Sequence, residues 1–382
     1  MYYLRLVRGY QVLDLVRWLL TATAASVVAA FLLRALGRAL SDPAGASPGR
    51  LLWCLPPLAA VAWFAAAAAR AVPAHRPERI AGLTAAGAGL RRIRALIAGE
   101  VALACSLGSG CALLLFLVLR NDIADESLAA DLGMGTPLPL AAPITLLALV
   151  PAVAGLAAAA AVSTPETLPG RPAETAPRAF HPLRLALPIG LTAVGLALEL
   201  YGLRPGAAQD GRAVHLPAGL GTTSTALLVG WSLAALGVAL LTAPLLALAG
   251  RVLALGRPAP LRLLAGRGLG AEARRLGTPL AVLALTLAAV LTAARYWADR
   301  PGTVKTVPVI EVLLITACAV GAVVARLVEL RSARLGTTDS LLRLGTPPTL
   351  LRGAVALRTV AAGTVLLLTA GLTAALGAGA LR

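Results

Sequence analysis

Two stretches, LTAAGAGLRRIRALIAGE (Leu83–Glu100) and LLRLGTPPTLLRGAVALR (Leu341–Arg358), each place a basic segment with a glycine directly before an apolar run. Gly87 aligns with Gly345 at an offset of 258 residues (345 − 87), and the alignment needs no insertion or deletion. A repeat at one fixed spacing indicates a supersecondary unit that is used twice. The sequence therefore predicts two copies of a membrane module, each with a basic elbow that turns into a transmembrane helix.

The composition places the chain in the membrane. Hydrophobic residues make up 58% of its 382 residues and charged residues 13%, about half of the roughly 25% that is usual in soluble domains. The mean hydropathy is +0.83, and apolar runs of 18 or more residues recur along the chain. The net charge of +17 sits in short loops beside these runs. The positive-inside rule explains this charge with membrane lipids as the partner and without nucleic acid.

The apolar runs predict about nine transmembrane helices. An N-terminal surface helix over 1–17 precedes the first run. Basic loops around 76–94, 251–275 and 326–352 are expected in the cytoplasm, and the acidic loop 121–131 is expected outside. The N-terminus is then cytoplasmic and the C-terminus lies outside. The fold class is an all-α, polytopic membrane protein.

A second similarity links residues 261–298 with residues 4–40. Both segments begin with Leu-Arg-Leu, continue through an arginine-bearing helix and enter the membrane. Six apolar runs separate the two starts, so both copies point the same way. The two modules are therefore a parallel repeat, unlike the inverted repeats of many ion-coupled transporters.

The repeated segments resemble the signature of the FtsX-like permease family, the membrane subunits of MacB-type ABC transporters. That family has a helix of the type R-E-I-A-x-L-R-A-L-G-A, then R-x-I-R and a glutamate at the membrane. The approach segment Leu263–Pro279 is similar to the family's arginine-rich lead-in. The matching residues are Arg79, Ile80, Ala81, Leu83, Gly87, Ala88, Arg91, Ile93, Arg94 and Glu100 in the first copy, and Leu341, Arg343, Leu344, Gly345, Thr346, Leu350 and Arg352 in the second.

The resemblance implies a complete permease in one chain. Residues 1–162 and 251–382 would be two FtsX-like modules, and residues 163–250 a linking pair of helices. A separate, dimeric cytoplasmic ABC ATPase would engage the elbows and drive the export or release of an amphiphile, such as a lipid, a peptide or a hydrophobic natural product. The location would be the bacterial cell (inner) membrane. The chain departs from most relatives because it has no room for a large extracellular domain, and its second module stops after three helices.

The expected coupling residues lie in the two elbows. Gly87 and Gly345 provide a backbone break where a positive φ costs little. Arginines face lipid headgroups or an acidic groove of the ATPase, and Leu and Ile face protein or lipid. The coupling residues are Arg79, Leu83, Gly87, Arg91 and Arg94 in the first elbow, and Leu341, Arg343, Gly345 and Arg352 in the second. Ordinary positive-inside loops are the alternative interpretation of these residues.

The sequence offers no catalytic, cofactor-binding or metal-binding motif. A P-loop requires Gly-Lys-Ser/Thr, but Val304 precedes Lys305 and Thr306. The four cysteines lie in apolar runs without metal-ligand spacing. We therefore expect no enzyme activity in this chain and an ATPase in a partner.

Three acids in or beside apolar runs, Glu100, Glu199 and Glu311, are further candidates because charge is costly in lipid. Pairing or interfacial roles are favoured, with Arg295 or Arg300 as the partner of Glu311. Two alternatives remain open: an ion-coupled secondary transporter that uses Glu199 or Glu311, and a membrane signalling or scaffold subunit that does not transport.

Overall fold

The structure is a computed structural model that describes residues 12–41, 54–75, 77–122, 132–134, 137–139, 141–162, 182–204, 213–215, 222–255, 259–299 and 306–380. Within these ranges, nine helices are long and apolar enough to cross a membrane. The prediction of a polytopic helical membrane protein with about nine spans is confirmed. The surface helix expected over 1–17 and the acidic loop expected over 121–131 lie largely outside the described residues.

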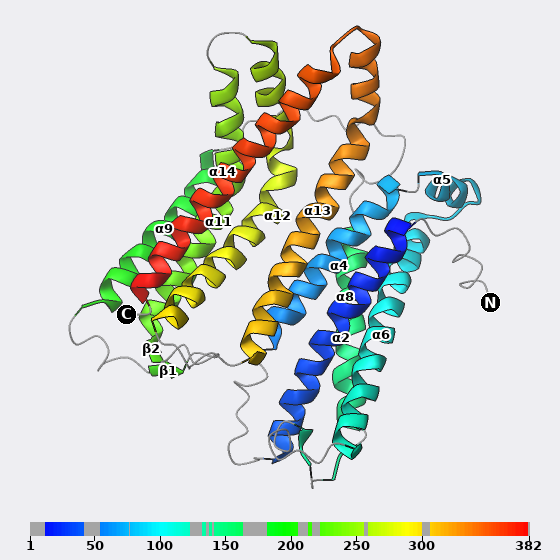
Figure 1. The fold of residues 1–382 in the computed structure, drawn as a ribbon, viewed down its shortest axis with the longest axis vertical. Coiled ribbons are helices and arrows are strands. Elements are labelled where there is room, and N and C mark those ends of the chain that lie inside the picture. The colour runs from blue at the N-terminus through cyan, green and yellow to red at the C-terminus, as the bar shows by residue number, and fades with distance from the viewer. Residues whose placement is uncertain are drawn as a thin grey trace. The chain divides into compact units, whose positions relative to one another are not determined.

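The chain forms two compact units, residues 1–171 and 172–382. In the first unit, α6 packs against α2 and α8, and α4 packs against α8. The short helix α5 runs crosswise to α6 (Figure 1). The helices of this unit are α2 (Val12–Ser41), α4 (Leu55–His75), α5 (Pro77–Ala85), α6 (Leu90–Asp122) and α8 (Ala141–Ala161).

Two apolar clusters hold the first unit together. One joins α4, α5, α6 and α8 close to the start of α6 and includes Ile80, Ile93 and Ile97. The other joins α2, α6 and α8 further along and includes Leu33 and Phe116. Burial of Ile80, which is 2% exposed, ties the short α5 to the membrane helices.

The second unit is built around α11, which packs against α9, α12 and α14, while α13 packs against α12. Two three-residue strands pair as an antiparallel hairpin between α9 and α11. The elements are α9 (Pro182–Gly202), β1 (Ala213–His215), β2 (Thr222–Ser224), α11 (Thr225–Ala254), α12 (Pro260–Ala298), α13 (Thr306–Arg343) and α14 (Pro348–Ala380).

Glycines bring the helices of the second unit into close contact. A Cβ at Gly195 of α9 would lie 2.3 Å from the backbone nitrogen of Ala234 in α11. A Cβ at Gly266 of α12 would lie 2.5 Å from the carbonyl oxygen of Gly250 in α11. Small residues let helices approach each other in lipid, where association depends on van der Waals packing. At these positions the glycines therefore have a packing role.

The helices of the second unit extend further than the apolar runs predict. The sequence predicts a separate surface stretch over 251–275, but residues 260–275 form the beginning of the 39-residue α12. Likewise α13 continues past its apolar run to Arg343. At 1.5 Å per residue α12 is about 58 Å long, almost twice the hydrocarbon thickness of about 30 Å. Part of α12 therefore projects beyond the membrane.

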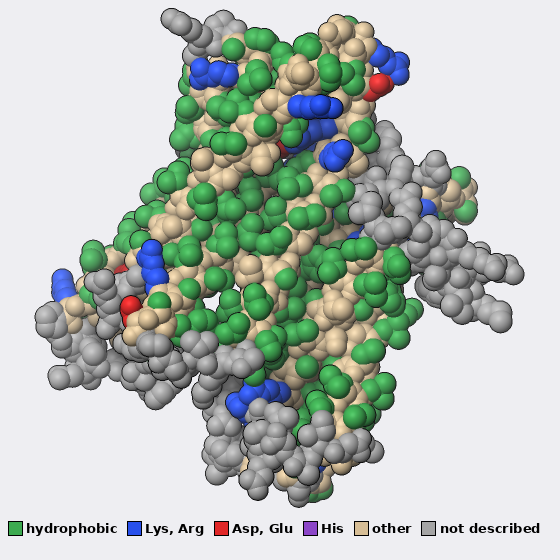
Figure 2. Space-filling model, in the orientation of Figure 1, with side chains coloured by type: hydrophobic (Ala, Val, Ile, Leu, Met, Phe, Trp, Pro, Cys, Tyr) green, Lys and Arg blue, Asp and Glu red, His purple; other side chains and the backbone are tan. Residues whose placement is uncertain are grey.

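The two units do not settle the predicted division of the chain into 1–162, 163–250 and 251–382, which stays a prediction. The helix pair α9 and α11 belongs to the same compact unit as the second repeat. Apolar side chains cover most of the visible helix surface, and the charged side chains gather towards helix ends (Figure 2). This distribution agrees with helices that are surrounded by lipid.

Candidate functional site

The first elbow, residues 83–94, is a tight turn between α5 and α6. Gly87 has a φ of 78°, in the left-handed region that glycine adopts without steric cost. The N–H of Gly87 donates to the Thr84 carbonyl at 3.0 Å, and the N–H of Ala88 donates to the Leu83 carbonyl at 2.9 Å. This pair of bonds is the Schellman motif, which satisfies the last carbonyls of a helix.

The second elbow, residues 341–352, joins α13 and α14 by the same turn. Gly345 has a φ of 84°, and its N–H donates to the Leu342 carbonyl at 3.0 Å. The N–H of Thr346 donates to the Leu341 carbonyl at 3.1 Å. Every donor and acceptor in this turn is offset by 258 residues from its counterpart in the first elbow (345 − 87, 346 − 88).

The repeat also sets the helix boundaries on both sides of the turn. The helices before the two turns end at residues 85 and 343, and those after them run over 90–122 and 348–380, again 258 residues apart. The elbow and the helix that follows it therefore have the same local structure in both copies. The helix that precedes the turn differs between the two copies. In the first copy it is α5, a separate nine-residue helix, whereas in the second copy it is the end of the long helix α13.

The predicted coupling residues fall into two groups. Side chains that point away from the protein are found mainly on the turns and at the starts of α6 and α14. Near the second turn, Leu344 is 82% exposed, and Arg343 forms an exposed ion pair with Asp339 of the same helix at 2.7 Å. The exposed group is Gly87, Arg91, Arg343, Gly345 and Arg352; the half-buried group is Arg79, Leu83, Arg94 and Leu341.

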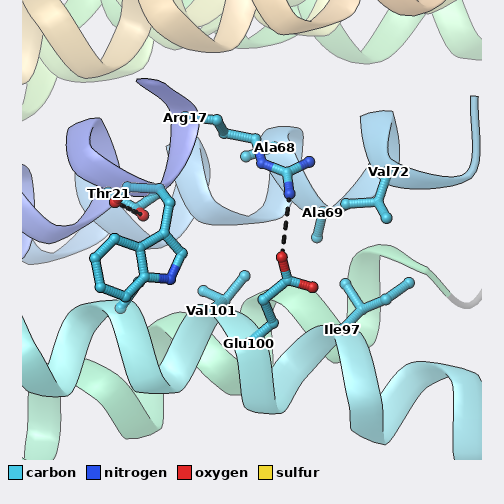
Figure 3. A pocket seen from close by; sticks show the side chains of 10 residues that line it. Arg17, Thr21, Ala68, Ala69, Val72, Ile97, Glu100 and Val101 are labelled. Atoms are coloured by element: carbon cyan, nitrogen blue, oxygen red, sulfur yellow. Dashed lines mark hydrogen bonds and ion pairs between the residues drawn. The ribbon is translucent and has the colours of Figure 1, made fainter. Parts of the chain in front are cut away.

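Glu100 is the centre of the first charge cluster, which we define as Arg17, Arg79 and Glu100. Its carboxylate lies 3.5 Å from the Arg17 guanidinium on α2 and 3.4 Å from the Arg79 guanidinium on α5. Arg17 and Glu100 point toward each other across a hollow with room for about one water molecule (Figure 3). One carboxylate from α6 thus joins two arginines from α2 and α5.

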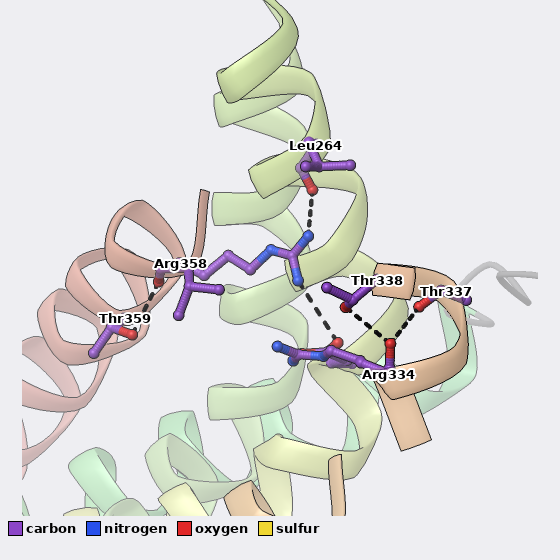
Figure 4. Close-up of polar contacts among 8 residues, drawn as sticks. Leu264, Arg334, Thr337, Thr338, Arg358 and Thr359 are labelled. Carbon is purple, nitrogen blue, oxygen red and sulfur yellow. Dashed lines mark hydrogen bonds and ion pairs between the residues drawn. The ribbon is translucent and has the colours of Figure 1, made fainter. Parts of the chain in front are cut away.

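Glu272 is the centre of the second charge cluster, which we define as Glu272, Arg334 and Arg358. The carboxylate of Glu272 on α12 forms an ion pair with Arg334 on α13 and lies 3.9 Å from Arg358 on α14. Arg358 also donates to the Leu264 carbonyl at 2.6 Å (Figure 4). Burial, together with the nearby positive charge of Arg358, lowers the pKa of Arg334.

The two charge clusters share one position of the repeat, and the charge at that position is opposite in the two copies. Glu100 and Arg358 occupy equivalent positions (358 − 100 = 258), each ten residues after the first residue of its helix. In the first unit the acid is on α6, the helix after the turn, and in the second unit it is on α12, before the turn. Each cluster still contains one carboxylate and two guanidinium groups, one from each of three helices.

Sequence reasoning missed the roles of Arg17, Glu272 and Arg334. A signal was present, because Arg358 stands where the first copy has Glu100. A half-buried arginine needs a compensating acid, and Glu272 is the acid in the sequence of α12. The pairing itself joins residues 62 and 86 positions apart (334 − 272, 358 − 272), which no local pattern specifies.

The two other candidate acids lie apart from the charge clusters. Glu199 on α9 is 4% exposed, and its Oε2 has no hydrogen-bond partner among the described residues. Glu311 on α13 is half-buried. In the described part of the chain it makes no ion pair, so the pairing with Arg295 is not found, and Arg300 lies outside this part.

Comparison with known proteins identifies no relative of this chain. No family model matches the chain, and neither a curated protein nor a solved structure matches it. Across the residues that the structure describes, no group of three or more His, Cys, Asp or Glu side chains is placed to hold a metal ion.

Proposed function

We propose that this chain is the permease subunit of an ABC transporter, and that a separate cytoplasmic ATPase dimer drives it through the two elbows. The observation that carries the proposal is the duplicated turn at Gly87 and Gly345, with the same φ sign and the same hydrogen bonds. A dimeric motor has two equivalent surfaces and needs two equivalent contacts. A chain with two matching elbows supplies them.

The chemistry of the elbows fits such a contact. Arg91, Arg352 and Leu344 are exposed around the turns. Guanidinium groups bind carboxylates in bidentate geometry, and an apolar side chain beside them adds buried area at an interface. ATP-driven closure of the partner would displace both elbows, and the attached helices α6 and α14 would move with them to extrude or release an amphiphile.

The test is co-purification of the tagged chain in mild detergent, followed by measurement of ATP hydrolysis. The proposal predicts a P-loop ATPase at two subunits per chain. A variant that carries Arg91→Glu and Arg352→Glu should lose this partner, because the acidic groove would then meet like charge. Both positions are exposed, so the fold should be unchanged.

The matched control is Arg204→Glu, at an exposed arginine just beyond the end of α9 and outside both elbow segments. It should retain the ATPase. Loss of the partner from Arg204→Glu as well, or its retention in the elbow variant, would contradict coupling through the elbows. An intact, folded chain without any ATPase would leave the ion-coupled role.

The burial of Glu199 favours ion-coupled secondary transport as the second candidate. A carboxyl group buried between α9 and α11 without a described hydrogen-bond partner at Oε2 is a potential proton or cation site. This candidate predicts transport in ATP-depleted vesicles that Glu199→Gln abolishes. The permease proposal predicts that ATP depletion stops transport and that Glu199→Gln has little effect.

A further inference from the structure

We infer that the two charge clusters are equivalent latches, each of which ties the helices beside an elbow to the first helix of its module. In the first unit the latch is Arg17, Arg79 and Glu100, and in the second it is Glu272, Arg334 and Arg358. These are positioning residues, since they act through the helices that carry them. The inference concerns the isolated chain and does not depend on the proposed function.

The position of the latches supports this role. Glu100 and Arg358 lie ten residues after Leu90 and Pro348, where α6 and α14 begin. At 1.5 Å per residue this is about 15 Å from the turn in both units. The helical segment between the turn and the charge cluster therefore has the same length in each module. The charge at the end of this segment is negative at Glu100 and positive at Arg358.

The helices that each latch connects also support this role. Arg79 is on α5, directly before the first turn, and its partner Glu100 also binds Arg17 on α2. Arg334 is on α13, before the second turn, and its partner Glu272 on α12 also approaches Arg358 after the turn. Displacement of the turn is thereby passed to α2 or α12 as well as to the helix that follows.

The structure of α12 leaves space for the Arg358 side chain of the second latch. A Cβ at Gly268 would fall 2.1 Å from the Arg358 guanidinium, so this guanidinium occupies the space that a side chain would take. Leu264, Gly268 and Glu272 follow one another at four-residue spacing and lie on one face of α12. The arginine therefore lies along α12 between a backbone carbonyl and a carboxylate, in a defined position.

Because Glu100 and Arg358 carry opposite charges at equivalent positions, variants that exchange the charges within a cluster test whether the two latches are equivalent. Exchanging the charges in the second unit, Glu272→Arg with Arg358→Glu, places the acid on the helix after the turn, as in the first unit. The reciprocal exchange, Arg17→Glu with Glu100→Arg, places the acid on the first helix, as in the second unit. If the clusters are equivalent latches, each exchange keeps one carboxylate between two guanidinium groups and should preserve the function of the latch.

The experiment measures the distance between elbow and first helix by pulsed electron paramagnetic resonance on the purified chain in lipid nanodiscs, without ATPase or nucleotide. Spin labels at Thr349→Cys and Ala271→Cys report on the second unit, and labels at Ala86→Cys and Leu20→Cys on the first. These four positions are exposed. The native cysteines, Cys54, Cys105, Cys111 and Cys318, are replaced beforehand.

The parent should give a narrow distance distribution in each unit. Glu272→Gln and Glu100→Gln should broaden the distribution of their own unit at least twofold, and the charge exchanges should restore the narrow one. Asp339→Asn, which removes an ion pair within a single helix, should leave both distributions unchanged. A merely structural role predicts broadening that no exchange repairs.

The inference is overturned if both Gln variants keep the parent distribution, or if the exchanges stay as broad as the single substitutions. Should one exchange fail to give folded protein, the other decides; failure of both also overturns the equivalence. Because no partner is present, this outcome is independent of the ATPase experiment. A lost latch with a retained ATPase, or the reverse, separates the two proposals.

Discussion

Gly87 and Gly345 stand 258 residues apart and adopt the same left-handed backbone conformation, with φ values of 78° and 84°. Each closes a Schellman turn through hydrogen bonds of 2.9 to 3.1 Å. The turn is followed in both cases by a helix of 33 residues. The two elbows are therefore the same local structure built twice, from sequences that share few residues besides the glycine.

The first prediction concerns these glycines. Gly87→Ala and Gly345→Ala should each lower the free energy of unfolding by about 1–2 kcal/mol, because a Cβ is disfavoured at positive φ. A Cβ at either position would meet no heavy atom within 4 Å, so the loss would come from the backbone alone. The unfolding midpoint in detergent measures it.

The matched controls are Gly89→Ala and Gly336→Ala. Both glycines also have open space for a Cβ, but neither has a positive φ. Gly336→Ala, within α13, should stabilise by up to about 1 kcal/mol because alanine favours helices. Equal loss at Gly87 and Gly89 would contradict the role of the left-handed turn.

A second prediction tests the place of Arg358. Gly268→Ala should displace the guanidinium from the Leu264 carbonyl and lower the free energy of unfolding by about 1.5–3 kcal/mol, the cost of a lost hydrogen bond to a charged group. Gly270→Ala, two residues away with nothing within 4 Å, should not destabilise. Indistinguishable unfolding midpoints for the two variants would show that Arg358 is free to move.

The third prediction concerns the contact between α9 and α11. Gly195→Ala should destabilise by about 1–3 kcal/mol, because a Cβ would lie 2.3 Å from the backbone of Ala234 and the helices must separate. Gly190→Ala on the same helix has open space and should be neutral or slightly stabilising. The comparison uses thermal unfolding of the two variants, and a larger loss at Gly190 would contradict the packing.

The fourth prediction concerns Glu199, which is buried with an unpartnered Oε2 among the described residues. Glu199→Met keeps a similar volume and removes the buried carboxyl group. It should raise the free energy of unfolding by about 1–3 kcal/mol, since a buried polar atom without a hydrogen bond is costly. A lower unfolding midpoint for Glu199→Met would show that the carboxyl group has a stabilising partner and would strengthen the ion-coupled alternative.

The transmembrane spans were predictable because the bilayer imposes length and apolarity on each of them. The elbows were predictable because glycine is the residue that adopts positive φ at little cost. Their common offset of 258 residues follows from the positions of the two glycines in the chain (345 − 87). The identical hydrogen bonds at Gly87 and Gly345 follow from this combination of glycine position and helix end.

The continuation of α12 and α13 beyond the membrane was not predictable from hydropathy. Apolar runs mark the part of a helix that lipid surrounds, but they do not mark where the helix ends. Residues 326–343 are rich in Arg and Leu, which favour helix. The hydroxyl groups of Thr337 and Thr338 bond back to the Arg334 carbonyl within the helix, so these threonines do not terminate it.

The charge clusters could not be predicted from the sequence. Arg17 and Glu100 come from helices that are far apart in the chain, and their pairing depends on how α2 packs against α6. Only the exchange of Glu100 for Arg358 between the repeats hinted at a compensating acid. That acid, Glu272, was visible in the sequence as a charge within a basic segment, without a pattern that gave it a partner.

The most direct measurement is photo-crosslinking in intact cells from equivalent positions in the two elbows. Ala86 and Leu344 are both exposed and differ by the repeat offset of 258 (344 − 86), and a photoreactive residue at Leu203, which is 51% exposed at the end of α9, serves as the control. Coupling through both elbows predicts that positions 86 and 344 crosslink to one and the same P-loop ATPase, while position 203 does not. Crosslinks from only one elbow, to two different proteins, or from neither elbow would contradict it.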